Sequence, residues 1–287
     1  MKKIKKYFSI IKPLIYLFLL LIAASISLHI INLIINIILG LNTGEFDFGQ
    51  EIIFAIPHLG SLLIEITVAA VYYIWYRRIK KKEALTKKIK ITIRDIGFLL
   101  LWGMGIMFLE NGLVNIMFIV LEVYFPQLVS DYSNMMSFLY EGNLVLLAIR
   151  VAIVAPIFEE LVCRGVILKK ASYIMPFYVA NITQAILFAL LHMNLIQIIY
   201  AFPLGLIFGY VTKKYRSLIP AILLHALING FSVLSVAYNK ITEEPIDLSI
   251  WFMLVLTIVG GFIFVAGYFK INRNTYIEEK AVQEIQV

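Results

Sequence analysis

The sequence predicts an all-α polytopic membrane protein, with about eight transmembrane helices around a buried polar cavity. Of its 287 residues, 61% are hydrophobic and only 15% are charged, whereas soluble domains are closer to half apolar and one quarter charged. The apolar residues form long blocks, each near the roughly 20 residues that a helix needs to cross a bilayer. Continuous apolar blocks indicate helices, because the strands of membrane barrels alternate.

Eight apolar blocks follow one another along the chain and define the expected spans. They cover residues 13–39, 52–76, 96–124, 143–168, 175–192, 195–212, 218–238 and 248–270. The first block is longer than the core of a signal peptide, so we interpret it as a retained span. The connection from Pro126 to Asn143 is expected to hold a short interfacial helix. Gly205 and Gly209 form a Gly-xxx-Gly pattern, which favours close helix packing.

Basic residues gather in alternate connections between these blocks. The basic groups are Lys2, Lys3, Lys5 and Lys6; Arg77, Arg78, Lys80, Lys81, Lys82, Lys87, Lys88, Lys90 and Arg94; Lys169 and Lys170; Lys213, Lys214 and Arg216; and Lys270 and Arg273. The other connections carry Glu45, Asp47 and Glu51; Asp131 and Glu141; and Glu243, Glu244 and Asp247 with Lys240. Because positive charge stays on the cytoplasmic side, both termini are expected to be cytoplasmic. The same distribution argues against nucleic acid as the partner of the net charge of +7.

Three ionisable residues of the fourth block stand out, because charges are costly in lipid. Glu160 and Arg164 are four residues apart, so they share a helix face and can pair. Glu159 points about 100° away from its neighbour. One carboxylate is therefore neutralised locally, and Glu159 is left facing a different part of the molecule.

Further polar residues repeat this spacing in two other blocks. His192 follows Phe188 by four residues, and Asn229 follows His225 by four. These side chains and Glu159 are expected to converge on one buried pocket. A carboxylate and a histidine can together deprotonate a water molecule, and a histidine and an amide can donate hydrogen bonds to an oxyanion. Together these groups would allow a water molecule to attack a peptide bond without a covalent intermediate.

Taken in order, these motifs resemble those of the CAAX protease and bacteriocin-processing family. This family of intramembrane endopeptidases includes the eukaryotic Ras-converting enzyme and many bacterial Abi proteins. The resemblance covers residues 143–236 and rests on Glu159-Glu160-x-x-x-Arg164, Phe188-x-x-x-His192 and His225-x-x-x-Asn229. It implies a catalytic core at 143–238, preceded by three spans with a basic cytoplasmic loop (1–142) and followed by a last span and tail (239–287).

The resemblance also implies the roles of the motif residues. Glu159 corresponds to the general base, which holds the attacking water together with His192. His225 and Asn229 correspond to the pair that stabilises the oxyanion. The remaining motif residues are supporting ones: Glu160 and Arg164 as an ion pair, and Phe188 as a packing residue. No metal and no other cofactor are implied.

The expected substrate is a peptide or protein in or at the lipid bilayer. A composition rich in Ile, Lys and Asn is typical of a low-GC bacterium, which favours the bacterial cell membrane as the location. Two alternatives stay open. One is a non-catalytic membrane scaffold or bacteriocin-immunity protein, and the other is a zinc-dependent hydrolase with Glu159, His192 and His225 as metal ligands.

Two features remain outside the motifs. Arg150 needs an anion inside the membrane, and Glu65 or Glu110 could supply it; a structural role is favoured, and a substrate-binding wall is the alternative. In addition, straight spans would leave His192 roughly 10 Å away from Glu159 in depth. We therefore expect tilted or irregular helices around a water-filled cavity, with bends at Pro156 and Pro176.

Overall fold

The computed structural model describes residues 2–38, 49–82, 91–243 and 249–285, and within these ranges all regular structure is helical. Six of the described helices are long and apolar enough to cross a membrane. Their apolar segments are Tyr7–Ala24, Leu59–Lys80, Ile93–Tyr124, Leu195–Tyr215, Ile219–Thr242 and Ile250–Asn272. The predicted class, an all-α integral membrane protein, is therefore confirmed.

The exact count of eight spans is not confirmed. The fourth predicted span is helical from Leu144 to Ser172, but α-helical and π-helical segments alternate within it. These segments are α5 (Leu144–Ala148), η1 (Ile149–Val154), α6 (Ala155–Glu160), η2 (Leu161–Leu168) and α7 (Lys169–Ser172). The fifth predicted span is α8 (Phe177–Leu190). Its 14 residues extend only about 21 Å, less than the roughly 30 Å of a hydrocarbon core.

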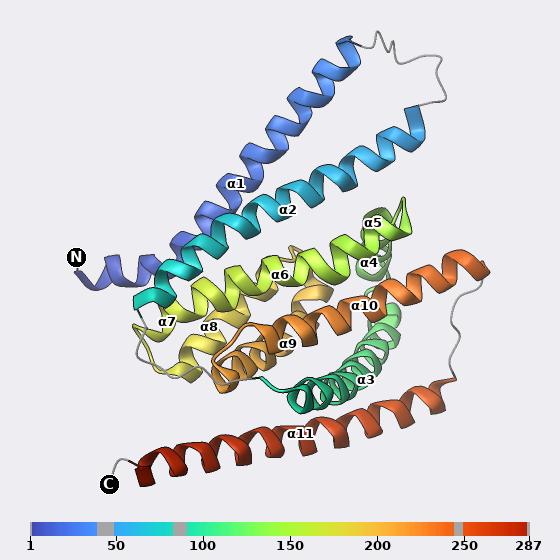
Figure 1. Cartoon of the computed structure of the whole chain (residues 1–287). Helices are drawn as coiled ribbons and strands as arrows, with labels where there is room; N and C mark the ends of the chain where they lie inside the picture. The colour runs from blue at the N-terminus through green and yellow to red at the C-terminus, as the bar shows by residue number, and fades with distance from the viewer. Residues whose placement is uncertain (1, 39–48, 83–90, 244–248, 286–287) are drawn as a thin grey trace.

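The other helices, all long except α4, pack around this centre (Figure 1). They are α1 (Lys2–Ile38), α2 (Gly49–Lys82), α3 (Ile93–Tyr124), α4 (Pro126–Leu139), α9 (Leu195–Tyr215), α10 (Ile219–Thr242) and α11 (Ile250–Ile285). The start of α1, the end of α2, the α7–α8 and α9–α10 connections and the end of α11 all lie at one end, on the left in Figure 1. Helix α4 is the short helix predicted between Pro126 and Asn143. Of the predicted charged connections, Glu45, Asp47, Lys87, Lys88, Lys90, Glu244 and Asp247 lie outside the described residues.

Local hydrogen bonds explain where several helices begin. The Thr92 hydroxyl accepts from the Asp95 backbone N–H while the Asp95 carboxylate accepts from the Thr92 N–H, a reciprocal capping box that starts α3. Asn143 caps α5 by accepting from the N–H groups of Val145 and Leu146. Asn194 caps α9 in the same way. These caps satisfy N–H groups that have no partner within the helix itself.

Two groups of buried apolar residues hold the helices together. One joins α1, α2, η2 and α8, and the other joins α3, α9, α10 and α11. In the second group the Trp102 indole N–H donates to the Phe264 carbonyl at 2.9 Å, which fixes α11 against α3. Without a hydrophobic driving force between helices in lipid, such packing and hydrogen bonding supply the association energy.

Helices α8 and α9 pack closely at the predicted Gly-xxx-Gly pattern. A Cβ atom at Gly205 would lie 3.0 Å from the Ala185 Cβ, and one at Gly209 would lie 1.8 Å from the Asn181 side-chain oxygen. The second contact leaves no room for a methyl group. Small residues thus let the two backbones approach, as the pattern predicted.

We expect Gly209→Ala to lower the stability of the detergent-solubilised protein, because α9 must move away from Asn181. The matched control is Gly97→Ala in α3, where an added Cβ meets nothing within 4 Å. That change should leave stability equal or slightly higher, since alanine favours a helix over glycine. Thermal unfolding of both variants measures the difference, and equal melting temperatures would contradict this packing.

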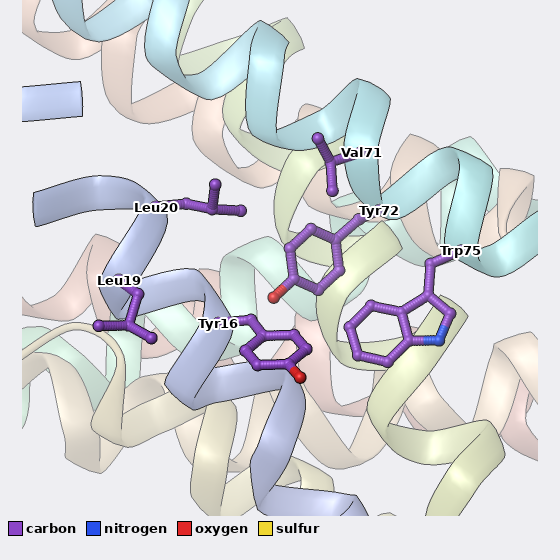
Figure 2. Close-up of a pocket in the computed structure, with 6 residues that line it drawn as sticks. All are labelled: Tyr16, Leu19, Leu20, Val71, Tyr72 and Trp75. Carbon is purple, nitrogen blue, oxygen red and sulfur yellow. The ribbon is translucent and has the colours of Figure 1, made fainter. Parts of the chain in front are cut away.

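Two cavities lie away from the motif residues. One, of about 300 Å³, lies between α1 and α2 and is lined by Tyr16, Leu19, Leu20, Val71, Tyr72 and Trp75 (Figure 2). The other, of about 370 Å³, is bordered by α3, α9 and α11 and includes Glu110. Neither is lined by Glu159, His192 or His225. The polar cavity expected around those residues therefore stays a prediction.

Candidate active site

The site is built on the helix that runs from Leu144 to Ser172. Glu159 and Glu160 are the last two residues of α6, which lies between the π-helical segments η1 and η2. A π-helical turn widens the helix and rotates the following side chains relative to a regular α-helix, and such turns are frequent at functional sites. Pro156, in the first turn of α6, is buried and does not end the helix. The irregular helix predicted here is thus present as two π segments.

Glu160 and Arg164 form a fully buried ion pair. The Arg164 Nη1 donates to the Glu160 Oε1 at 2.8 Å, and both side chains have no solvent exposure. The Arg164 Nη2 donates to the Gly205 carbonyl at 3.0 Å. The guanidinium also lies over the rings of Phe188, at 4.3 Å, and Phe208, at 5.2 Å. Both terminal nitrogens are thus hydrogen-bonded and two aromatic rings lie against the guanidinium, which offsets its removal from water, while Nε has no hydrogen-bond partner among the described residues.

His225 of α10 joins this pair through its first ring nitrogen. Its Nδ1 lies 3.0 Å from Glu160 Oε1, the oxygen that also accepts from Arg164. A carboxylate can only accept, so this contact assigns the proton to Nδ1. The ring also stacks on Phe208, with centroids 5.0 Å apart. The orientation of the imidazole is therefore fixed, and its second nitrogen, Nε2, is directed at Glu159.

Glu159 differs from its neighbour in both exposure and contacts. Its side chain is 22% exposed, whereas that of Glu160 is fully buried. Its Oε2 lies 3.8 Å from His225 Nε2, which is longer than a hydrogen bond. Within the described part of the chain, this buried oxygen has no hydrogen-bond partner; Oε2 of Glu160 has none either, but Oε1 of Glu160 is contacted by both Arg164 and His225. Glu159 thus carries a carboxylate oxygen that is out of water, close to an imidazole and not engaged.

Phe188 connects the two histidines. Its ring makes edge contacts with His192, at 5.1 Å between centroids, and with His225, at 5.8 Å. The His192 Nδ1 lies 3.0 Å from the Phe188 carbonyl. Among the described residues, His192 has no hydrogen bond to Glu159. The structure therefore brings His225 close to Glu159, while His192 reaches the same cluster through the ring of Phe188.

Asn229 faces η1 from the next turn of α10. Its Nδ2 donates to the carbonyl of Val151 at 3.0 Å. In a π-helical turn the backbone pairing is altered, so a side-chain amide can satisfy a carbonyl there. This contact attaches α10 to the helix that carries Glu159. In the resting structure the amide is thus used within the protein.

The predicted difference in depth between Glu159 and His192 becomes small. The helix of Glu159 continues to Ser172, and α8 starts at Phe177. Counted from the connection between them, Glu159 is 13 residues away and His192 is 15, which is about 20 and 22 Å. The short α8 therefore places His192 near the level of Glu159, as the expectation of an irregular arrangement required.

Sequence reasoning did not identify the polar partners on α8 and α9. Gln184 is fully buried and donates to the Asn181 side chain and to the Gly205 carbonyl, both at 2.8 Å. Asn181 donates to the Leu206 carbonyl at 2.9 Å. Gln184 lies four residues before Phe188, so its position on the motif face of α8 was a usable signal. No sequence feature identifies the Gly205 carbonyl as an acceptor, because every residue carries a backbone carbonyl.

A second ion pair lies beside the first site. Arg150 in η1 donates from Nε to the Glu65 Oε1 of α2 at 2.9 Å. Of the two predicted anions, Glu65 is therefore the partner, and Glu110 lies elsewhere, against the cavity of α3, α9 and α11. Helix α2, which carries Glu65, packs against both α6, which carries Glu159, and η1, which carries Arg150. The second ion pair thus lies on helices that are in contact with the one that carries Glu159.

The zinc alternative needs three ligands at one point. In the ranges that the structure describes, no three His, Cys, Asp or Glu side chains are grouped closely enough to hold a metal ion. Glu159 and His225 are close, whereas among the described residues His192 contacts Phe188 and makes no hydrogen bond or ion pair with either of them. The donor set does not fit a zinc site, so we derive no step through a metal.

The fold and the site together define an integral membrane protein with a buried carboxylate–histidine cluster. Residues 141–231 match the family model of type II CAAX prenyl endopeptidases, Rce1-like. This match confirms the resemblance seen in the motifs, and every motif residue lies inside the matched segment. It implies a protease, which is a hydrolase. Neither curated proteins nor solved structures gave a significant match.

Proposed function

We propose that this chain is an intramembrane endopeptidase that cleaves a membrane-associated peptide or protein with a water molecule activated by Glu159. The observation that supports this most directly is the buried Oε2 of Glu159, which has no hydrogen-bond partner among the described residues, belongs to a side chain that is 22% exposed and lies 3.8 Å from His225 Nε2. An unsatisfied buried carboxylate oxygen is costly. A water or a substrate group bound between these two atoms would satisfy the oxygen and offset that cost.

The surrounding residues would serve this chemistry as follows. Arg164 and Glu160 hold the His225 ring through Nδ1, so that Nε2 faces the reacting group. Glu159 takes the proton of the attacking water as the new C–O bond forms, and returns it to the amide nitrogen when the C–N bond breaks, so that the products are a carboxylic acid and an amine. When His225 is charged, its Nε2 also carries a proton and faces the substrate. This N–H donates to the developing oxyanion together with His192 or Asn229. Asn229 would first have to release the Val151 carbonyl, which makes substrate binding a step that rearranges η1.

A scaffold or bacteriocin-immunity role receives less support. A scaffold does not require that Glu160 contacts both Arg164 and His225 while Oε2 of the neighbouring Glu159 has no hydrogen-bond partner among the described residues. Bacteriocin processing is one substrate choice within the proposed activity. A peptide pheromone or the terminus of a membrane protein fits the same site.

Cleavage of a proteome-derived peptide library by the purified protein tests this function. Detergent-solubilised wild type is incubated with the library, with and without excess chelator, and new peptide ends are identified by mass spectrometry. Cleavage in both samples is expected. Cleavage that chelator abolishes and zinc restores would instead assign the site to a zinc hydrolase. No cleavage by wild type in either sample would overturn the proposed function.

The proposed orientation places both termini and the basic connections in the cytoplasm of a bacterial cell. It is supported by the position of these segments at one end of the molecule (Figure 1) and by the positive-inside rule. The buried Cys163 is the sole cysteine, so a Cys163→Ala background permits single-cysteine labelling. In intact cells, a membrane-impermeant maleimide should label Ile241→Cys and spare Arg78→Cys until the membrane is permeabilised. The reverse pattern would invert the orientation.

A further inference from the structure

In the part of the chain that the structure describes, the ion pair between Arg150 and Glu65 leaves most hydrogen-bond donors of Arg150 unused. Both side chains are largely buried, at 20% and 14% exposure. Arg150 uses only Nε in its contact with Glu65 Oε1. Within the described residues, its two terminal nitrogens, Nη1 and Nη2, have no hydrogen bond or ion pair. A guanidinium presents five N–H donors in a planar fork, so most of its hydrogen-bonding capacity is unused.

The free part of this guanidinium cannot simply face lipid. A charged group inside a bilayer is paired, lies against the protein interior or borders a water-filled path. Arg164 shows how this chain holds a purely structural cation, with a carboxylate, a backbone carbonyl and two aromatic rings. Among the residues that the structure describes, Arg150 has one of these partners only, the Glu65 carboxylate. The contrast indicates that Nη1 and Nη2 are left for something outside the chain.

The planar shape of the guanidinium indicates which group would bind to its two terminal nitrogens. Two parallel N–H groups of a guanidinium match the two oxygens of a carboxylate. Glu65 does not use this match, because it contacts Nε alone and its other oxygen, Oε2, is buried with no partner in the described part of the chain. Glu65 instead orients the guanidinium from the side. The open edge therefore fits a second carboxylate.

The position relative to Glu159 relates this site to the substrate. Arg150 is nine residues before Glu159 on the same helix, which is about 13 Å along the axis. An extended peptide covers that distance in about four residues at ~3.3–3.6 Å each. Asn229 of α10 donates to the carbonyl of Val151, the residue after Arg150, and so holds α10 against the same part of the helix. One extended substrate could thus place its scissile bond at Glu159 and a carboxylate at Arg150.

We infer that Arg150, oriented by Glu65, binds a carboxylate of the substrate a few residues from the scissile bond. This inference rests on the proposed endopeptidase function. The carboxylate is either the C-terminus of the substrate or an acidic side chain, and both present the same two oxygens. Because the contact is made in the bound substrate as well as in the transition state, its loss raises KM more than it lowers kcat.

The test compares peptides that differ only in that charge. Wild type is given the peptide library in its native form and after chemical amidation of all carboxyl groups. Peptides that are cleaved are then synthesised in three forms: with a free C-terminus and any acidic side chains, with a C-terminal amide, and with Asp or Glu replaced by Asn or Gln. The last two forms distinguish the two sources of the carboxylate.

We expect amidation to reduce kcat/KM of wild type by about 10- to 100-fold, the size of one charge-assisted contact. Arg150→Gln should lose this preference, cleaving acid and amide forms at equal rates, while Arg150→Lys retains part of it. Glu65→Gln keeps the guanidinium and should keep a preference for the acid. The double variant Glu65→Gln/Arg150→Gln leaves no buried charge unpaired, so it separates loss of binding from loss of folding.

The failures of the two proposals are distinguishable. If wild type cleaves acid and amide forms alike, or if Arg150→Gln slows both forms equally, the carboxylate site is overturned while the peptidase function stands. If wild type cleaves neither library, the peptidase function fails and the carboxylate site fails with it. Size-exclusion elution and melting temperature of every variant are recorded beside the kinetics.

Discussion

Glu159→Gln is expected to reduce kcat for peptide cleavage by about 10²- to 10⁴-fold, the usual contribution of a general base. The amide has the shape of the carboxylate but cannot take a proton from water. The partly exposed Glu159 is not the partner of Arg164, so the variant should remain folded. Its KM should change little, since the proton transfer occurs only in the transition state. Initial rates on one identified peptide measure the effect.

The matched control for this change is Glu122→Gln, an exposed carboxylate near the end of α3. It removes the same charge without touching the site and should retain the wild-type rate. Glu160→Gln forms the second comparison, because it weakens the ion pair with Arg164 and the contact to His225. Equal kcat for Glu159→Gln and wild type would exclude Glu159 as the base.

Arg164→Met is expected to destabilise the protein by about 3–5 kcal/mol, the cost of leaving a buried charge without its partner. The change removes the donor to Glu160 Oε1 and to the Gly205 carbonyl, and both acceptors lie where water does not reach. Unfolding of the detergent-solubilised variant by heat or denaturant measures the loss. The control is Arg78→Met, an exposed arginine at the end of α2, which should change little.

A double variant separates charge from packing in this prediction. Glu160→Gln/Arg164→Met removes both charges, so it should recover part of the stability that Arg164→Met loses. No recovery would mean that Arg164 acts mainly through its contacts with Phe188 and Phe208. A stability of Arg164→Met equal to that of wild type would contradict the buried pair altogether.

The class of fold follows from composition alone, because apolar blocks of bilayer length admit few other structures. The Glu160–Arg164 pair follows from helix periodicity, since residues four apart meet on one face. The short helix α4 and the close approach at Gly209 also follow from short-range signals. These features depend on local spacing, which a sequence displays directly.

Other features depend on contacts between distant segments. The π-helical turns of η1 and η2 arise where a helix adapts to its neighbours, and neither has a sequence signature of its own. They divide the fourth predicted span, and α8 is shorter than the fifth predicted span, so the count of eight is not confirmed. Spacing also could not show that His225, rather than His192, lies next to Glu159. For the same reason, spacing could not show whether Glu65 or Glu110 forms the ion pair with Arg150.

The central claim is that Glu159 delivers water directly to the scissile carbonyl, without an acyl-enzyme. Trapping with hydroxylamine tests it on an identified peptide substrate of the purified wild type. Direct attack by water predicts that the new C-terminus is a free carboxylic acid, and that millimolar hydroxylamine leaves the products unchanged. Formation of the peptide hydroxamate would reveal a covalent acyl intermediate and would contradict the account.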